Sequence, residues 1–281
     1  MATIVAIAPR ARPAADQALR WSLVALTATA WLSGAIFGAY ILAYYVGAVP
    51  AGTMQDWNSV LPRLYEAQGS PAANMGIGVH FMLGAVLLLL GPLQLIAGVR
   101  TRWPRFHHWV GRTYVASAIL TGIGGLTFIA LRGTVGGLPM SIAFALYGAA
   151  MVVCGAETLR HAMARRLQRH RAWAIRLFAL AVGSWLYRMD YGFWFLLFGK
   201  AGHTADFHGP FDYFMDFWFY LPNLLVAELA IRSTAPRSSA AMKWGASGVI
   251  AGVTAFLVLA AYFFTTRSWG VAILWRLGWW A

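Results

Sequence analysis

The chain alternates between long apolar stretches without charge and short segments that carry almost all of its charged residues. No charged residue lies between Arg20 and Asp56, and comparable uncharged runs recur along the chain. Because a bilayer core about 30 Å thick solvates neither charges nor free peptide groups, a spanning helix needs roughly 20 apolar residues. Five runs reach or approach that length without a charge: 21–49, 77–99, 113–131, 138–156 and 244–266.

Two further runs, 176–199 and 211–231, are equally apolar but contain Arg188, Asp190, Asp216 and Glu228. The pattern predicts an all-α integral membrane protein with about seven transmembrane helices. We expect a cytoplasmic segment over 1–20 and a seven-helix membrane domain over 21–268. An interfacial tail over 269–281 would follow, with an aromatic belt made of Trp269, Trp275, Trp279 and Trp280.

Composition agrees with this pattern, since 60% of the residues are hydrophobic and only 11% are charged. Seven helices would use roughly half of the chain, so the loops are too short for a separate soluble domain. The single cysteine, Cys154, excludes an intramolecular disulfide. The sequence has no nucleophile elbow, phosphate loop or zinc-protease motif, which argues against a hydrolase.

The net charge of +13 is distributed asymmetrically. Four basic clusters would share one side of the membrane if seven helices alternate, and they are Arg10 to Arg20, Arg100 to Arg112, Arg160 to Arg176 and Arg232 to Lys243. The positive-inside rule then places the N-terminus in the cytoplasm and the C-terminus outside, in a bacterial inner membrane. We expect these loops to meet anionic lipid rather than nucleic acid. Membership of a homo-oligomer or a larger membrane complex stays open.

One face of the second predicted helix carries a stripe of polar and small residues, namely His80, Gly84, Gly91, Gln94 and Gly98, which fall within about 40° of one line. Glycines allow a flat ligand to lie against a helix backbone, so the stripe is a candidate cofactor groove. They equally allow a neighbouring helix to pack closely. Both interpretations remain open at this stage.

Charged residues inside the predicted spans suggest two polar clusters, because buried ionisable groups pair, line a cavity or hold a cofactor. By depth, an outer cluster would contain His80, Arg188, Asp190 and Asp216, with Asn223 on the same helix face as Asp216. A simple Arg188–carboxylate pair is the alternative. An inner cluster would contain Gln94, His107, His108, Arg112, Glu157, His161, His170, Arg176 and Glu228. Ordinary pairs on helix surfaces explain part of that second set.

Five blocks of the chain carry a resemblance to a known family. They are His80 with Gly84 and Gly91-Pro92-Leu93-Gln94; Arg100, Pro104, His107-His108-Trp109-Val110-Gly111-Arg112 and Tyr114; Gly136-Gly137; His170 to Arg176 with Arg188; and Pro222-Asn223-Leu224-Leu225 with Ala227-Glu228. Together they resemble an uncharacterised family of predicted bacterial multi-pass membrane proteins, known only as a domain of unknown function. Either His107 or His108 matches the family's usual histidine. The resemblance implies a membrane fold and these residues, but no activity.

Three classes of function remain. The first is a redox protein that holds b-type haem or works near quinone, because histidines hold haem in helical bundles and arginines can meet its propionates. His80 would serve the outer side, and His107, His108, His161 or His170 the inner side. A second ligand opposite His80 would have to come from the outer loop, as His203 or His208. The second is a proton-coupled transporter, in which Arg188, Asp190, Asp216, Glu228 and His80 line a pathway. The third is a non-catalytic subunit or assembly factor.

Overall fold

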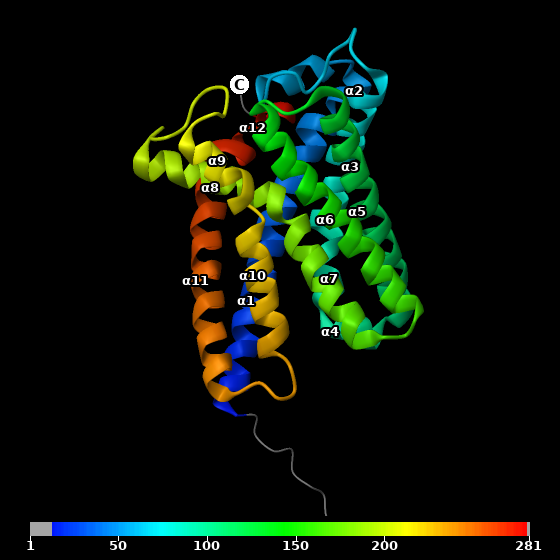
Figure 1. The fold of residues 1–281 in the computed structure, drawn as a ribbon, viewed down its shortest axis with the longest axis vertical. Coiled ribbons are helices and arrows are strands. Elements are labelled where there is room, and N and C mark those ends of the chain that lie inside the picture. Colours follow the sequence, from blue (N-terminus) through cyan, green and yellow to red (C-terminus); the bar gives the residue numbers. More distant parts are fainter. Residues whose placement is uncertain (1–12, 280–281) are drawn as a thin grey trace, which may run out of the picture.

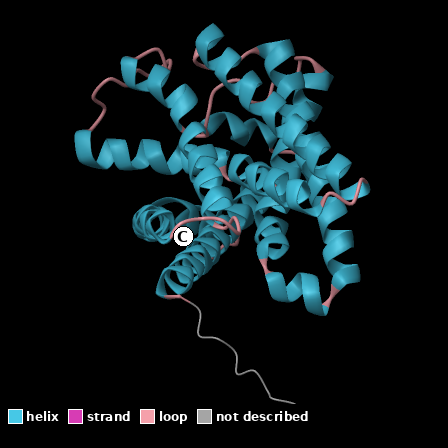
Figure 2. Ribbon diagram, turned by 60° about the horizontal axis from the view of Figure 1, so that its bottom comes forward, coloured by secondary structure: helices cyan, strands magenta, loops and turns pink. Residues whose placement is uncertain are grey.

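The computed structural model describes residues 13–279, which form helices and loops without any β-strand (Figure 2). Among these residues, six helices are long and apolar enough to cross a membrane: Ala14–Ala51, Pro71–Leu95, Pro104–Arg132, Gly137–Met163, Pro210–Ser233 and Ala240–Arg276. The protein is therefore an all-α multi-pass membrane protein, as the hydrophobic pattern predicts.

The first span is built from α1 (Ala14–Ile41), the π-helical segment η1 (Leu42–Val46) and α2 (Ala48–Ala51). It ends at Gly52, whose φ of 69° is left-handed and therefore favours glycine. A short 3₁₀ helix, η2 (Met54–Ser59), follows in the outer loop. The Ser70 side chain then caps α3 by accepting a hydrogen bond from the Ala73 amide.

The next helices are α3 (Pro71–Leu95), α4 (Ala97–Arg102), α5 (Pro104–Arg132) and α6 (Gly137–Met163). Helices α3 and α5 approach closely at Gly76 and Gly124. A Cβ atom on Gly76 would lie 2.8 Å from the carbonyl oxygen of Gly124. On the other side of α3, Gly34 and Gly38 of α1 rest against Leu88, so small residues bring these three helices together as expected for membrane bundles.

The apolar run predicted over 176–199 does not form one continuous helix. The chain forms α7 (Leu167–Ala181), bends at Val182 and continues as α8 (Gly183–Phe198), which lies across the long axis of the bundle (Figure 1). Six continuous helices of the described chain are thus long enough to span, and the seventh predicted run is divided between α7 and α8. The bend is supported by packing: a Cβ atom on Gly183 would lie 3.2 Å from the Tyr147 ring. Tyr147 Oη also donates a hydrogen bond of 2.7 Å to the Leu180 carbonyl oxygen.

The following span is also interrupted. It consists of α9 (Pro210–Trp218) and α10 (Leu221–Ser233), with a break at Phe219 and Tyr220. Pro222 occupies the first turn of α10, where a backbone N–H would have no hydrogen-bond acceptor within the helix, so proline is tolerated there. Asn223 Nδ2 donates to the Phe219 carbonyl oxygen at 2.8 Å, and this bond satisfies a group that the break sets free.

The last span comprises α11 (Ala240–Phe264), the π-helical η3 (Thr265–Trp269) and α12 (Gly270–Arg276). Trp269 is 3% exposed and packs into the protein core rather than facing outward. Its ring lies 4.7 Å from that of Phe37, in the largest aromatic core of the described chain. Trp275 and Trp279 are exposed, as an interfacial belt requires, and Trp280 lies outside the described residues.

The described chain begins and ends at opposite ends of the molecule (Figure 1). The start of α1, the α4 helix, the α6–α7 turn and the α10–α11 turn all lie at one end, and these segments carry the described basic clusters. The charges therefore gather on one side, as the asymmetry along the sequence predicts. Below α8, Figure 1 shows one group of helices made of α1, α10 and α11, and another made of α3 to α7.

Candidate functional site

Arg188 on α8 is held within the outer half of the bundle. Its Nη1 donates a hydrogen bond of 2.9 Å to the Ser184 carbonyl oxygen one turn earlier on the same helix. The guanidinium carbon lies 5.2 Å from the centroid of the Phe37 ring, in a cation–π contact. Within the described residues, no carboxylate forms an ion pair with it. The side chain is therefore a partly buried cation without a counter-charge.

Three side chains from two other helices lie within electrostatic reach of Arg188, namely Tyr40 and Tyr45 from the first span and His80 from α3. The Tyr45 hydroxyl is buried and has no hydrogen-bond partner. His80 Nδ1 lies 3.1 Å from the Thr121 carbonyl oxygen, so Nδ1 carries the proton and donates. We call Tyr40, Tyr45, His80 and Arg188 the outer cluster. It offers hydroxyl, guanidinium and imidazole groups to a ligand that bears oxygen atoms.

The glycine stripe on α3 does not form one continuous groove. A Cβ atom on Gly91 would lie 3.0 Å from both the Phe178 and Tyr114 rings, so neighbouring helices fill this position. A Cβ atom on Gly84 or Gly98 would have no atom of another described side chain or helix within 4 Å. Packing explains the glycine at 91. Gly98 lies on α4, beyond the end of α3, so the interpretation as a groove along α3 survives only near Gly84.

The inner cluster is present and brings several of the sequence blocks together. Gln94 of α3 packs against Gly111 of α5, whose Cβ position lies 2.9 Å from Gln94 Oε1. His107 is in ring contact with His108 at 6.0 Å and within electrostatic reach of His170. His170 Nδ1 lies 3.0 Å from the Thr158 carbonyl oxygen.

Two arginines of the inner cluster have local partners. Arg176 of α7 forms an ion pair with Glu228 of α10 and lies over the Trp173 ring at 4.9 Å. Arg112 lies over the Trp109 ring at 5.3 Å. Most of the inner cluster is thus tied up in helix–helix contacts. The exceptions are Gln94 Nε2, His107 Nδ1 and His161 Nδ1, which are buried without a hydrogen-bond partner among the described residues.

The predicted acids do not join Arg188 directly. Asp190 makes no hydrogen bond or ion pair with the described residues. Asp216 is 1% exposed, and neither carboxyl oxygen has a partner. Asp216 lies instead within electrostatic reach of Tyr187, and Tyr187 lies within electrostatic reach of Arg188 as well. Tyr187 therefore stands between the two predicted groups.

Sequence reasoning missed the aromatic half of this site. Tyr40, Tyr45 and Tyr187 were not selected, although Tyr40, Tyr44 and Tyr45 gather near the outer end of the first span. The sequence places Asp212 on the same helix face as Asp216 but does not reveal its partners: Asp212 accepts hydrogen bonds from Tyr191 Oη at 2.8 Å and His203 Nδ1 at 2.7 Å. No group of three His, Cys, Asp or Glu side chains in the described chain could hold a metal ion.

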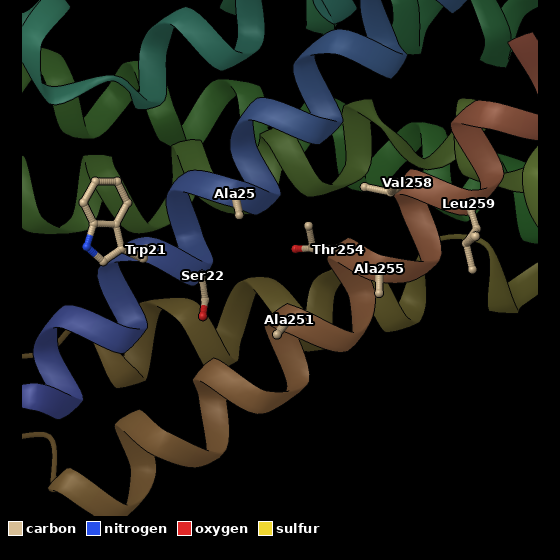
Figure 3. Close-up of a pocket in the computed structure, with 8 residues that line it drawn as sticks. All are labelled: Trp21, Ser22, Ala25, Ala251, Thr254, Ala255, Val258 and Leu259. Atoms are coloured by element: carbon tan, nitrogen blue, oxygen red, sulfur yellow. The ribbon is translucent and has the colours of Figure 1, made fainter.

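A groove of about 680 Å³ between α1 and α11 lies apart from both clusters (Figure 3). Small and apolar side chains line it, namely Trp21, Ser22, Ala25, Ala251, Thr254, Ala255, Val258 and Leu259. Gly248 and Gly252 of α11 also face open space, so they do not serve packing within the described chain. The groove contains no charged group and offers no chemistry of its own.

The fold and these buried clusters define an integral, multi-pass membrane protein. The chain belongs to the family described as "Predicted membrane protein (DUF2306)", whose model matches residues 77–231, more than half of its length. The match begins just before His80 and ends just after Glu228, so it confirms the resemblance that the sequence blocks suggest. No curated protein and no solved structure matches the chain.

Proposed function

We propose that this protein is a bacterial inner-membrane transporter that takes up a small organic carboxylate at Arg188 together with a proton. The observation that carries the proposal is a guanidinium inside the bundle that no carboxylate of the described chain neutralises. Removing a charge from water costs several kcal/mol unless a partner compensates it. A carboxylate ligand supplies that partner, because its two oxygens match the guanidinium fork.

The surroundings of Arg188 favour an organic anion over an inorganic one. The Phe37 ring lies under the guanidinium, and the Tyr45 and Phe81 rings lie 4.1 Å apart beside it in the same apolar core. Apolar walls with a few placed polar groups are typical of sites for small organic molecules. Tyr40 and Tyr45 can donate to a ligand oxygen that Arg188 does not reach.

Two helix breaks near the site support transport. The α7–α8 bend and the α9–α10 break are in contact, since a Cβ atom on Gly183 would lie 3.5 Å from the Phe219 ring. Transporters commonly bind substrate at discontinuous helices, where main-chain groups are free and the helix halves can move. At the basic end, the Arg176–Glu228 ion pair links α7 to α10, where a latch between moving groups would lie.

The proposal is tested by uptake into liposomes that contain the purified protein. Radiolabelled lactate and benzoate serve as aliphatic and aromatic probes, and phosphate serves as the inorganic anion. We expect uptake of at least one carboxylate, and Arg188→Gln to lower it by about a hundredfold, because a charge-assisted bidentate contact contributes roughly 3 kcal/mol. Arg267→Gln is the matched control, because Arg267 also lies over a phenyl ring but is exposed.

Uptake that persists in folded Arg188→Gln protein would show that Arg188 is structural. Uptake of phosphate alone would overturn the carboxylate specificity. Thermal unfolding of both variants distinguishes loss of binding from loss of the fold. If Arg188→Gln unfolds at the same temperature as Arg267→Gln, its lost uptake reflects lost binding.

The aromatic lining favours a redox function as the second candidate, with a flat quinone or b-type haem in the outer cluster. His80 would be the haem ligand, with Gly84 beside it. The His80 ring interacts with the Thr121 carbonyl oxygen and, electrostatically, with Arg188, and no other histidine of the described chain interacts with it. An absorption spectrum of air-oxidised and dithionite-reduced protein decides this: a Soret band lost in His80→Ala supports haem, and a colourless protein excludes it.

A further inference from the structure

Beside the outer cluster, a second set of polar side chains connects the outer loop to the buried Asp216. Asp212 of α9 is fully buried and accepts four hydrogen bonds, from Tyr191 Oη, His203 Nδ1 and the amides of Thr204 and Gly209. One helical turn further on, Asp216 is 1% exposed and accepts none. Two carboxyl groups on the same helix thus lie in opposite environments.

The contrast between these acids assigns them different protonation states. Four donors satisfy the Asp212 carboxylate, which can therefore remain ionised. An ionised carboxylate without any donor is far costlier to bury, so the neutral acid is the form of Asp216 that this site accommodates. The groups that face Asp216 are Asp212 on its own helix, Tyr187 of α8 and His208 of the preceding loop. From α6, Tyr147 also approaches this region, because its ring lies 5.0 Å from the ring of Phe219, three residues after Asp216.

A path of side-chain contacts leads from the outer loop toward this acid and ends at Tyr187. The His203 side chain is 10% exposed and lies in the loop between α8 and α9, with Nδ1 2.7 Å from Asp212 Oδ1. Tyr191 Oη lies 2.8 Å from the same oxygen. The Tyr191 and Tyr187 rings are 4.8 Å apart, and Tyr187 Oη is buried without a partner.

Tyr187 ends this path of contacts and lies within electrostatic reach of both Asp216 and Arg188. We propose that Asp216 carries the proton that enters with the substrate, and that His203, Asp212, Tyr191 and Tyr187 deliver it from the outer side. This inference rests on the proposed transport function. A proton from the outer solution binds His203 at Nε2, and the Nδ1 proton moves to Asp212 Oδ1. Tyr191 and Tyr187 then each accept one proton and release their own. A bridging water carries the proton over the last step to an Asp216 oxygen, because no described side chain donates to that carboxyl group. The same proton leaves Asp216 when the carboxylate leaves Arg188, so no net charge crosses the membrane.

The proton on Asp216 can be observed without any substrate. We would record infrared spectra of the purified protein between about pH 4 and pH 9, a range that spans ordinary and strongly shifted carboxyl groups. The carbonyl stretch of a protonated acid should be present in the wild type, titrate with pH and lose its Asp216 component in Asp216→Asn, while Asp190 can contribute a component of its own. Asp190→Asn is the matched control, because Asp190 lies on α8 outside the path. A full acid band in Asp216→Asn, or a band that does not respond to pH, would overturn the proposal.

A second measurement tests delivery. After a pH jump, the acid band in His203→Gln should reach its final height about a hundredfold more slowly than in the wild type, as expected when a proton relay is removed. An unchanged rate would exclude His203 from the path.

In liposomes, coupling of one proton to one substrate supports about tenfold accumulation per unit of pH gradient. Asp216→Asn should abolish this accumulation, and normal accumulation in that variant would refute the assignment. Arg188→Gln should abolish accumulation but keep the infrared band. A wild type that shows the titrating band but transports no probe would contradict the proposed function alone, so the two failures are distinguishable.

Discussion

Glu228 on α10 accepts a hydrogen bond from Arg176 Nε on α7, and this ion pair joins the two groups of helices near their basic end. Arg232 lies 3.8 Å from the other Glu228 oxygen, one helical turn away. Both partners of the pair are about a quarter to a third exposed, so water screens it only partly. A contact that is specific yet inexpensive to break suits the proposed latch.

Glu228→Gln should therefore change the separation of α7 and α10 more than it changes stability. We expect a loss of about 1 kcal/mol in the free energy of unfolding. Spin labels at Arg169 and Arg237, in a Cys154→Ser background, should report a broader distance distribution. Glu157→Gln is the control, because Glu157 pairs with Arg160 on its own helix. An unchanged distribution in Glu228→Gln would exclude the latch.

The glycine stripe on α3 provides a second test, because its members differ in their surroundings. Gly91→Ala should lower the free energy of unfolding by about 1–3 kcal/mol, since the Tyr114 and Phe178 rings leave no room for a methyl group. Gly84→Ala should raise it by about 0.5–1 kcal/mol, because nothing lies within 4 Å and alanine favours helices. Equal effects on unfolding in detergent would contradict this difference in packing.

Much of the fold follows from the sequence because hydrocarbon imposes a simple rule on helix length and charge. The rule failed at 176–199, where an apolar run of sufficient length bends at Val182. That bend depends on Tyr147, which lies on another helix and supplies the donor for the Leu180 carbonyl oxygen. Such a long-range contact leaves no local signal in the apolar pattern.

The site was predicted in part for a similar reason. His80 and Arg188 could be matched by depth, because the rise per residue places both in the outer half. Asp190 could not be excluded in that way: two residues from Arg188, it points elsewhere on α8 and has no partner. The intermediate position of Tyr187 depends on α8 lying across the bundle, which the apolar pattern does not reveal.

The α7–α8 bend yields a third prediction. Tyr147→Phe removes the donor to the Leu180 carbonyl oxygen and leaves that buried group unpaired, which costs about 1–3 kcal/mol. Tyr262→Phe should have little effect, because Tyr262 is 64% exposed. Chemical unfolding of the two variants in the same detergent compares them directly. If both lose the same stability, the bend does not depend on the Tyr147 hydroxyl.

The outer loop supplies a prediction about pH. A hydrogen bond from Arg276 Nη2 to Asp56 Oδ2, 2.8 Å long, ties η2 to α12. This hydrogen bond holds the pKa of the Asp56 carboxyl below its ordinary value of 3.8. Because the pKa of Asp56 is lower in the folded than in the unfolded protein, the ionised carboxylate stabilises the fold at pH values above 3.8. This stabilisation is lost as the pH falls through the pKa of Asp56 in the folded protein.

Hydrogen exchange of the amides in 54–59 tests this sign. Near neutral pH the wild type should be better protected than Asp56→Asn, because only the wild type keeps the ionised partner of Arg276. The difference should shrink once the pH falls below 3.8, because Asp56 is protonated first in the unfolded state and, at lower pH, in the folded state as well. Comparing the two proteins at each pH cancels the intrinsic pH dependence of exchange. A difference that grows as the pH falls would show that the Arg276 contact does not stabilise the ionised form, and that other contacts, such as the bond from Tyr44 Oη to the Asp56 carbonyl oxygen, hold the loop.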